Sequence, residues 1–307
     1  MNVMAQAPPR ILSSILEAIG GTPLLRLSLP GVPPGVELLG KCEWWNPGGS
    51  IKDRTALFLI EEGERSGALR PGKTIIDSSS GNTAVGLALV GRAKGYAVEL
   101  VMPESVSRER LRLCRAYGAS IVSTDAFSGS DGALERVREM VQREPDRYFY
   151  ADQYRNPANP LAHYRTTGPE IWEQTSGRIT HFVAGLGTTG TVVGTGRYLH
   201  ERNPQVRIVA VEPDEPLHGL EGLKHLDSAV VPEIYDPSIQ DEKVTVSTED
   251  GLRMCRTVLD SDGILIGHSA GAALHVARNL SAGLTRGVVV ALLSDGAQRY
   301  MAENSAR

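Results

Sequence analysis

The 307-residue chain has few cysteines, few aromatic residues and only a small excess of negative charge. Its three cysteines, Cys42, Cys114 and Cys255, are widely spaced and form no CxxC pair, which argues against a disulfide framework or a zinc site. The net charge of −4 predicts no surface for nucleic acid. No apolar run is long enough to span a membrane, and the first residues lack the apolar segment of a signal peptide. We therefore expect a cytoplasmic protein that binds no metal, nucleic acid or membrane.

The order of apolar and polar residues predicts an α/β fold. Strand and helix patterns alternate, which is typical of βαβ units with parallel sheets. The proline-bearing segment 146–170 interrupts this alternation, and the irregular segment 213–241 has the length of a functional loop. The expected strands are 24–27, 36–40, 74–77, 98–102, 120–123, 180–184, 206–211 and 288–293. The expected helices are 11–19, 55–64, 83–94, 107–117, 132–143, 190–201, 248–259 and 271–279.

The stretch Glu43–Arg54 places a lysine in an unusual position. Its Pro-Gly-Gly sequence at 47–49 predicts a tight turn, and Ser50 can cap the helix that follows. Lys52 then falls in the first helical turn, where the positive end of the helix dipole disfavours a cation. The same field lowers the pKa of its amine, as suits a lysine that forms a Schiff base. An ordinary solvated lysine is the alternative interpretation.

Two glycine-bearing turns join strands to helices. In the turn 184–191, backbone N–H groups at a helix start favour a phosphate, and Thr188, Thr189 and Thr191 add hydroxyl donors. A purely structural turn is the alternative there. The turn 77–83 holds three serines and an asparagine before a helix. A site for a bound carboxylate and a turn that only caps the helix are about equally good interpretations of it.

The turn 184–191 also matches the dinucleotide fingerprint G-x-G-x-x-G through Gly185, Gly187 and Gly190. Glu212, at the end of the next expected strand, imitates the acid that binds a ribose in such folds. A dinucleotide-binding oxidoreductase is therefore an alternative of a different class. The fingerprint explains neither the lysine stretch nor the threonines, which suit one compact phosphate better than a pyrophosphate.

Together these segments resemble the fold-type II pyridoxal-phosphate enzymes, and within them the cysteine synthase family, most closely its B branch. The resemblance covers residues 20 to about 300 in family order. Its motifs are Gly20–Leu24, Asn46–Arg54, Ser80–Thr83, Asn156–Asn159, Gly187–Thr191 and Gly267–Ala272. It implies a fold like the tryptophan synthase β chain, with two three-layer α/β domains and a cleft between them.

The resemblance also assigns residues to pyridoxal 5'-phosphate and to the substrate. Lys52 matches the lysine that forms the internal aldimine, Asn82 the asparagine that bonds the ring hydroxyl, and Ser269 the serine that meets the pyridine nitrogen, with Ser294 as a second candidate. A neutral hydroxyl at that nitrogen suits β-elimination and replacement. The phosphate loop matches Gly187, Thr188, Thr189, Gly190 and Thr191, and the positions that hold the substrate carboxylate match Ser79, Ser80, Thr83 and Gln153.

The resemblance further implies where the domains lie. Residues 41–150 are expected to form a smaller, mobile domain that carries the carboxylate loop. Residues 151–307 are expected to form a larger domain that carries the phosphate loop, and residues 1–40 to contribute to it. The chain departs from the family pattern at Ser78, Ala84 and His268, which leaves the exact substrates open.

The implied activity is that of a cysteine synthase. Lys52 would remove the α-proton of an O-substituted L-serine, the β-group would leave to give an α-aminoacrylate, and a sulfur nucleophile would add to give L-cysteine. A serine or threonine dehydratase is the alternative on the same scaffold. A homodimer is implied, and sulfide, thiosulfate or a sulfur-carrier protein are possible sulfur donors.

The leaving group depends on Lys224 in the irregular segment. The B-branch relatives that use O-phosphoserine have an arginine at the matching position, and lysine keeps the charge without the bidentate fork. We therefore expect Lys224 to favour O-phospho-L-serine over O-acetyl-L-serine, with a solvated loop lysine as the alternative.

Overall fold

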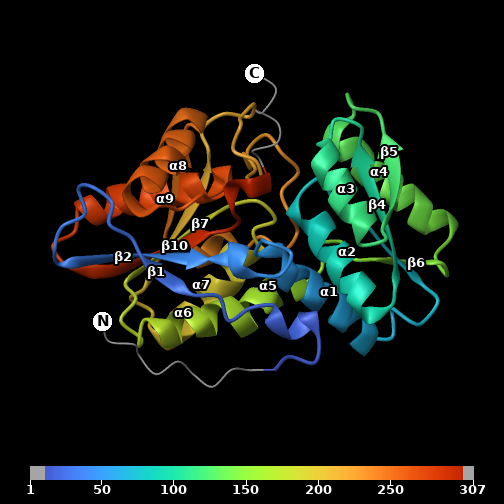
Figure 1. The fold of residues 1–307 in the computed structure, drawn as a ribbon, viewed down its shortest axis with the longest axis horizontal. Coiled ribbons are helices and arrows are strands. Elements are labelled where there is room, and N and C mark those ends of the chain that lie inside the picture. The colour runs from blue at the N-terminus through green and yellow to red at the C-terminus, as the bar shows by residue number, and fades with distance from the viewer. Residues whose placement is uncertain (1–10, 300–307) are drawn as a thin grey trace.

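The computed structural model describes residues 11–299. Residues 1–10 of the expected segment 1–40 and residues 300–307 of the expected domain 151–307 lie outside the described residues. Its strands form two sheets with helices on both faces of each, in two parts that lie side by side (Figure 1). This arrangement confirms the expected α/β architecture. No helix among these residues is long and apolar enough to cross a bilayer.

The larger sheet has six strands in the order β1-β2-β10-β7-β8-β9. All neighbouring strands are parallel except β1, which runs antiparallel to β2. The strands are β1 (Leu24–Arg26), β2 (Val36–Cys42), β7 (His181–Gly185), β8 (Arg207–Pro213), β9 (Glu242–Val246) and β10 (Gly287–Leu293).

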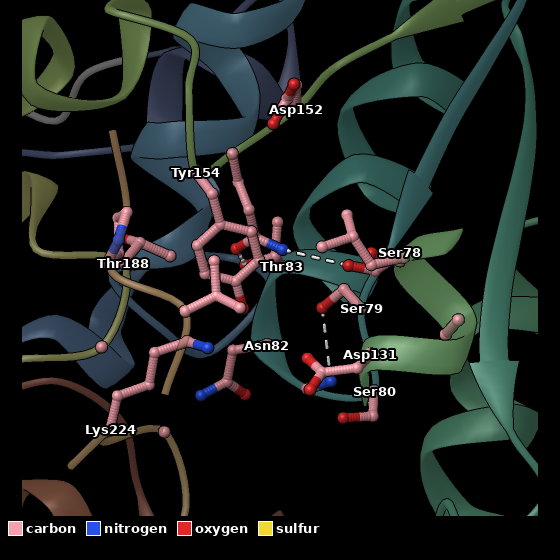
Figure 2. A pocket seen from close by; sticks show the side chains of 18 of the residues that line it. Ser78, Ser79, Ser80, Asn82, Thr83, Asp131, Asp152, Tyr154, Thr188 and Lys224 are labelled. Carbon is pink, nitrogen blue, oxygen red and sulfur yellow. Dashed lines mark hydrogen bonds between the residues drawn. The ribbon is translucent and has the colours of Figure 1, made fainter. Parts of the chain in front are cut away.

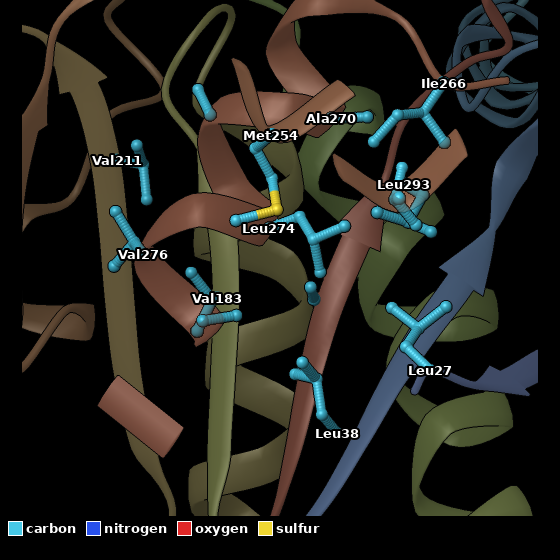
Figure 3. Close-up of a cluster of buried hydrophobic side chains, with 14 of the residues drawn as sticks. Leu27, Leu38, Val183, Val211, Met254, Ile266, Ala270, Leu274, Val276 and Leu293 are labelled. Carbon is cyan, nitrogen blue, oxygen red and sulfur yellow. The ribbon is translucent and has the colours of Figure 1, made fainter. Parts of the chain in front are cut away.

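Central strands of this sheet are buried on both faces, as parallel strands between helical layers are. In β10, Val289, Ala291 and Leu293 face the cluster formed with α8 (Thr248–Asp262) and α9 (His268–Ala282) (Figure 3). The alternate residues of β10 face a second cluster beneath α6 and α7. The helices on that side are α5 (Ala158–Ala162), α6 (Gly168–Gln174) and α7 (Gly190–Arg202).

The smaller sheet has four parallel strands in the order β5-β4-β3-β6. The helices α1, α2 and α3 share one core cluster with this sheet, and α4 packs in another cluster on its other face. The strands are β3 (Thr74–Ser78), β4 (Ala97–Pro103), β5 (Ser120–Thr124) and β6 (Tyr148–Tyr150). The helices are α1 (Lys52–Arg65), α2 (Asn82–Lys94), α3 (Arg108–Ala116) and α4 (Gly129–Arg143).

Some elements differ from the prediction. The expected helix 11–19 is a single 3-10 turn, Ile15–Ala18, and the segment 146–170 contains β6, α5 and a π-helical turn at His163–Thr167. Pro157 is the N-cap of α5, so it starts a helix where a break was expected. Strand β2 also runs to Cys42, two residues past the expected strand 36–40, as part of the larger sheet.

Candidate active site

The lysine stretch lies between β2 and α1. Gly49 has a positive φ of 80°, and its N–H donates to the carbonyl of Asn46 at 2.7 Å, which closes the expected turn. The N-cap of the following helix is Ile51 and has no side-chain cap bond, so the expectation that Ser50 caps this helix is wrong, although the Ser50 hydroxyl accepts from the N–H of Lys52 at 3.2 Å. The turn therefore places Lys52 at the first residue of α1.

Lys52 lines the cavity between the two parts of the molecule. Burial lowers the pKa of its amine to about 8, and the negative charge of Asp295 acts in the opposite direction. The sequence predicted this lowering from the helix dipole, whereas desolvation is the main cause in the structure. A substantial fraction of the amine is therefore neutral near physiological pH.

A buried ion cluster holds this stretch in place. It consists of Lys41, Glu43, Arg54 and Glu170, and the first three side chains are at most 1% exposed. Arg54 bonds Glu43 through Nε at 2.8 Å and Glu170 through Nη1 at 2.6 Å. Lys41 bonds Glu170 at 2.6 Å, and the Thr22 hydroxyl donates to Glu43 at 2.6 Å. Parts of the Gly20–Leu24 and Asn46–Arg54 motifs thus meet in one structural cluster beneath the lysine.

The glycine loop after β7 opens α7 at Gly190, with Thr189 as N-cap in the left-handed conformation. A side chain at Gly187 would meet the carbonyl oxygen of Gly222 at 2.2 Å, so the two backbones require glycine there. The hydroxyl of Thr189 is buried and has no hydrogen-bond partner among residues 11–299. A helix start with such a hydroxyl fits a bound phosphate.

Two residues that the sequence analysis did not assign brace this loop. Asn159 donates to the Thr188 hydroxyl at 3.1 Å and to the backbone carbonyl of Gln153 at 2.7 Å. His163 lies within 3.3 Å of the hydroxyls of Thr191 and Thr55. Burial holds the pKa of His163 well below its usual value, so its ring is neutral. Asn159 ends one of the quoted motifs, which was its sequence signal.

The serine loop follows β3 at the edge of the same cavity (Figure 2). Thr83 is buried, and its hydroxyl donates to the side-chain oxygen of Gln153 at 2.7 Å. The Gln153 amide donates in turn to the carbonyl of Ser78 at 3.3 Å. Ser79 and Ser80 line the cavity from this loop. The structure thus brings the four residues expected at the substrate carboxylate to one place.

On the opposite side, Ser269 is the second residue of α9. Its hydroxyl lies 2.7 Å from the hydroxyl of Ser294, which follows β10. Both serines line a small recess together with Lys52, Thr188 and Thr189. The two candidates for the ring nitrogen are therefore hydrogen-bonded neighbours.

Lys224 points into the larger cavity, with Nζ 4.9 Å from the centre of the Tyr154 ring (Figure 2). Burial lowers the pKa of Lys224, and the charge of Asp131 acts against this. The irregular segment is fixed there by Leu220, Leu223 and Leu226, whose side chains are buried. The N–H of Lys224 also donates to the carbonyl of Leu186 at 2.7 Å, so the segment is anchored beside the phosphate loop.

The predicted residues collect in two adjoining spaces between the parts. Both spaces lie at the carboxyl ends of parallel strands, where ligands bind in open α/β sheets. A cavity of about 330 Å³ is lined by Lys52, Ser79, Ser80, Asn82, Thr83, Gln153, Gly187, Thr188 and Lys224. The small recess is lined by Lys52, Gly187, Thr188, Thr189, Thr191 and Ser269, while Gly190 lines neither space and packs its α-carbon against Asn159.

These residues fit pyridoxal phosphate. The helix start and threonine hydroxyls offer donors for its phosphate, Lys52 an amine for its aldehyde, and the serine pair a neutral partner for its ring nitrogen. Glu212 does not fit the role of a ribose-binding acid. Its side chain is 2% exposed, accepts from the N–H of Leu226 at 3.2 Å and pairs with Lys243 at 2.7 Å.

Comparison with known proteins agrees with this geometry. The family model described as pyridoxal-phosphate dependent enzyme matches residues 15–295. A cysteine synthase of Aquifex aeolicus is 47% identical over 295 residues, covering 94% of this chain and 90% of the relative. Cysteine synthase B of Escherichia coli is 39% identical over 290 residues, covering 94% and 95%.

The fold is also similar to that of a solved structure. The crystal structure of a cysteine synthase from Entamoeba histolytica superposes with a TM-score of 0.92 at 35% identity, covering 97% of this chain and 92% of that one. The match extends through both sheets and the cleft between them. The chain belongs to the pyridoxal-phosphate dependent enzymes and, within them, to the cysteine synthase family.

Proposed function

We propose that the protein catalyses β-replacement on an O-substituted L-serine by a sulfur nucleophile, to give L-cysteine. The observation that carries the proposal is the meeting of Lys52, the phosphate loop and the serine loop around one cavity, in a chain that is 47% identical to a cysteine synthase. The test is to incubate the purified protein and cofactor with O-acetyl-L-serine and sulfide and to measure L-cysteine. Formation of pyruvate and ammonia without cysteine would favour a dehydratase.

The residues of the chain divide the work by position. When bound, the cofactor withdraws electrons from the α-carbon of the substrate and so acidifies its proton. We propose that Lys52, with its pKa near 8, takes up this proton. The serine loop and Gln153 hold the substrate carboxylate, and Thr188, Thr189 and Thr191 hold the cofactor phosphate. The smaller part closes over the cleft, which excludes water from the reacting atoms.

We further propose a cytoplasmic homodimer. Three free cysteines suit a reducing compartment. Exposed apolar side chains among the first described residues, including Ile11, Ile15 and Trp45, suit a subunit contact. Sedimentation of the full chain tests the dimer. Comparing sulfide, thiosulfate and a protein thiocarboxylate as donors tests whether a sulfur-carrier protein is a partner.

The Ser269→Asp variant tests the contact with the ring nitrogen. A carboxylate there should protonate the pyridine, shift the visible absorption band of the bound cofactor and lower the rate of cysteine synthesis. Ser294→Asp is the matched comparison, because the two hydroxyls are neighbours. A spectral change in Ser294→Asp alone would assign the contact to Ser294, and unchanged spectra in both would remove the pair from the ring.

The Lys224→Met variant tests the leaving group. Lys224 is a cation on the wall of the cavity, so it should favour a dianionic phosphate over an acetyl group. We expect kcat/KM for O-phospho-L-serine to fall by roughly 10- to 150-fold, or about 1.5–3 kcal/mol, and kcat/KM for O-acetyl-L-serine to change little. Equal losses for both donors, or none, would leave the acetyl donor as the natural one.

A further inference from the structure

Asp295 lies where three segments of the site meet. It follows β10, and Ser50 pairs with it in an isolated antiparallel bridge two residues before Lys52. The N–H of Ile51 donates to the carbonyl of Ser294 at 2.9 Å, and the N–H of Gly267 to the carbonyl of Asp295 at 3.1 Å. The backbone of Asp295 is therefore fixed against both the lysine stretch and the start of α9.

The side chain of Asp295 reaches across the cleft. It is fully buried, and its Oδ2 accepts from the Asn82 side-chain Nδ2 at 2.7 Å. Asn82 is the first residue of α2, in the part of the molecule built on the smaller sheet. A carboxylate can only accept, so this bond selects the orientation of the amide in which its NH₂ group faces Asp295. The bond therefore fixes which of the two polar atoms of the Asn82 amide faces Asp295.

The charge of Asp295 acts on Lys52 as well. Burial disfavours the ammonium form of Lys52, and the Asp295 carboxylate is the charge that opposes this effect. His163 contributes no charge there, because its ring is neutral. Removing the carboxylate while keeping its shape should therefore make Lys52 lose its proton at a lower pH.

We propose that Asp295 is a positioning residue of this active site: its carboxylate fixes the orientation of the Asn82 amide at the cavity wall, beside the stretch that carries Lys52. The proposal rests on the proposed function in assigning Asn82 and Lys52 to the cofactor. Asp295 itself lines neither the cavity nor the small recess.

The first experiment measures the proton on Lys52 directly. The full chain, freed of cofactor, is acetylated with a trace of acetic anhydride between pH 6 and pH 11, and labelling of Lys52 is followed by peptide mass spectrometry. In Asp295→Asn we expect the midpoint of the profile to fall by about one pH unit. Glu212→Gln is the control, because Glu212 is equally buried but lines neither space, and its midpoint should equal that of the wild type. An unchanged midpoint in Asp295→Asn would overturn the effect on Lys52.

The second experiment measures coupling between Asp295 and Asn82. Asp295→Asn, Asn82→Ala and the double variant are titrated with pyridoxal phosphate by fluorescence. At pH 10, where Lys52 is neutral in every variant, each single variant should bind at least several-fold more weakly, and the double variant no more weakly than Asn82→Ala, because Asp295 then acts on the cofactor through Asn82. Losses that multiply would overturn the role in positioning. Both experiments read out without turnover, so failure to make cysteine would count against the proposed function alone.

Discussion

Replacing Lys52 with alanine is expected to remove the cofactor's Schiff-base absorption and to lower kcat by at least about a thousandfold. The purified wild-type protein should be yellow, with a band that borohydride reduction abolishes. The fold should survive, because the side chain lies at the start of α1 and lines the cavity. Absorption spectra, cysteine formation and far-UV circular dichroism test the three parts.

Lys73→Ala is the matched control for this variant. Lys73 lies in the same part of the molecule, donates to the backbone carbonyls of Pro145 and Tyr148 at 3.1 and 3.2 Å, and lines neither space. It should retain both the colour and the activity. A wild-type protein that gains no band on addition of pyridoxal phosphate would contradict the assignment of Lys52.

Replacing Arg54 with alanine is expected to lower the free energy of unfolding by about 3–5 kcal/mol. The change leaves Glu43 buried without its main cation and takes two bonds from Glu170. Urea denaturation measures the loss. The control is Arg65→Ala on the same helix, because Arg65 forms an exposed pair with Glu62 and its loss should change the free energy of unfolding little. Similar losses in both variants would show that the buried ion cluster does not hold the lysine stretch.

The same cluster makes the stability of the wild-type fold fall at acid pH. Burial opposes ionisation of Glu170, but its bonds to Arg54 and Lys41 hold its pKa down to about 2. A carboxyl group with a lowered pKa stabilises the fold above its ordinary value of 4.5, and this stabilisation is lost as the pH falls toward 2. In Arg54→Ala this part of the acid dependence should shrink.

Every strand that the sequence predicted exists in the structure, and even the partly buried β1 and β5 lie within one residue of their expected ranges. Strands β3, β4, β7, β8 and β10 lie within two residues of the expected ranges, because their continuous apolar runs have few alternative structures. The missed strands β6 and β9 are short or carry charges, as in Glu242–Val246. Strand β6 pairs with β3, and β9 pairs with β8. The residue types of β6 and β9 give little sign of this pairing, because it depends on the neighbouring strand.

The site residues likewise fall into those that the sequence predicted and those that it did not. Lys52, the glycine loop and the serine loop have local signatures, since each depends on a turn that leads into a helix. The contact of His163 with Thr191 joins residues 28 positions apart, and for Asn82 and Asp295 the separation is 213. No periodicity or spacing encodes such contacts, so only the folded chain could reveal them.

The close approach of Gly187 and Gly222 has a consequence for redesign of the enzyme. A Cβ atom at Gly187 would meet the carbonyl oxygen of Gly222 at 2.2 Å, and the N–H of Lys224 donates to Leu186. The backbone that presents residue 224 therefore rests on the loop assigned to the cofactor phosphate. Insertions or deletions between 220 and 226 would disturb both at once. Libraries that aim at a new leaving group should vary the side chain at 224 and keep the length of this segment fixed.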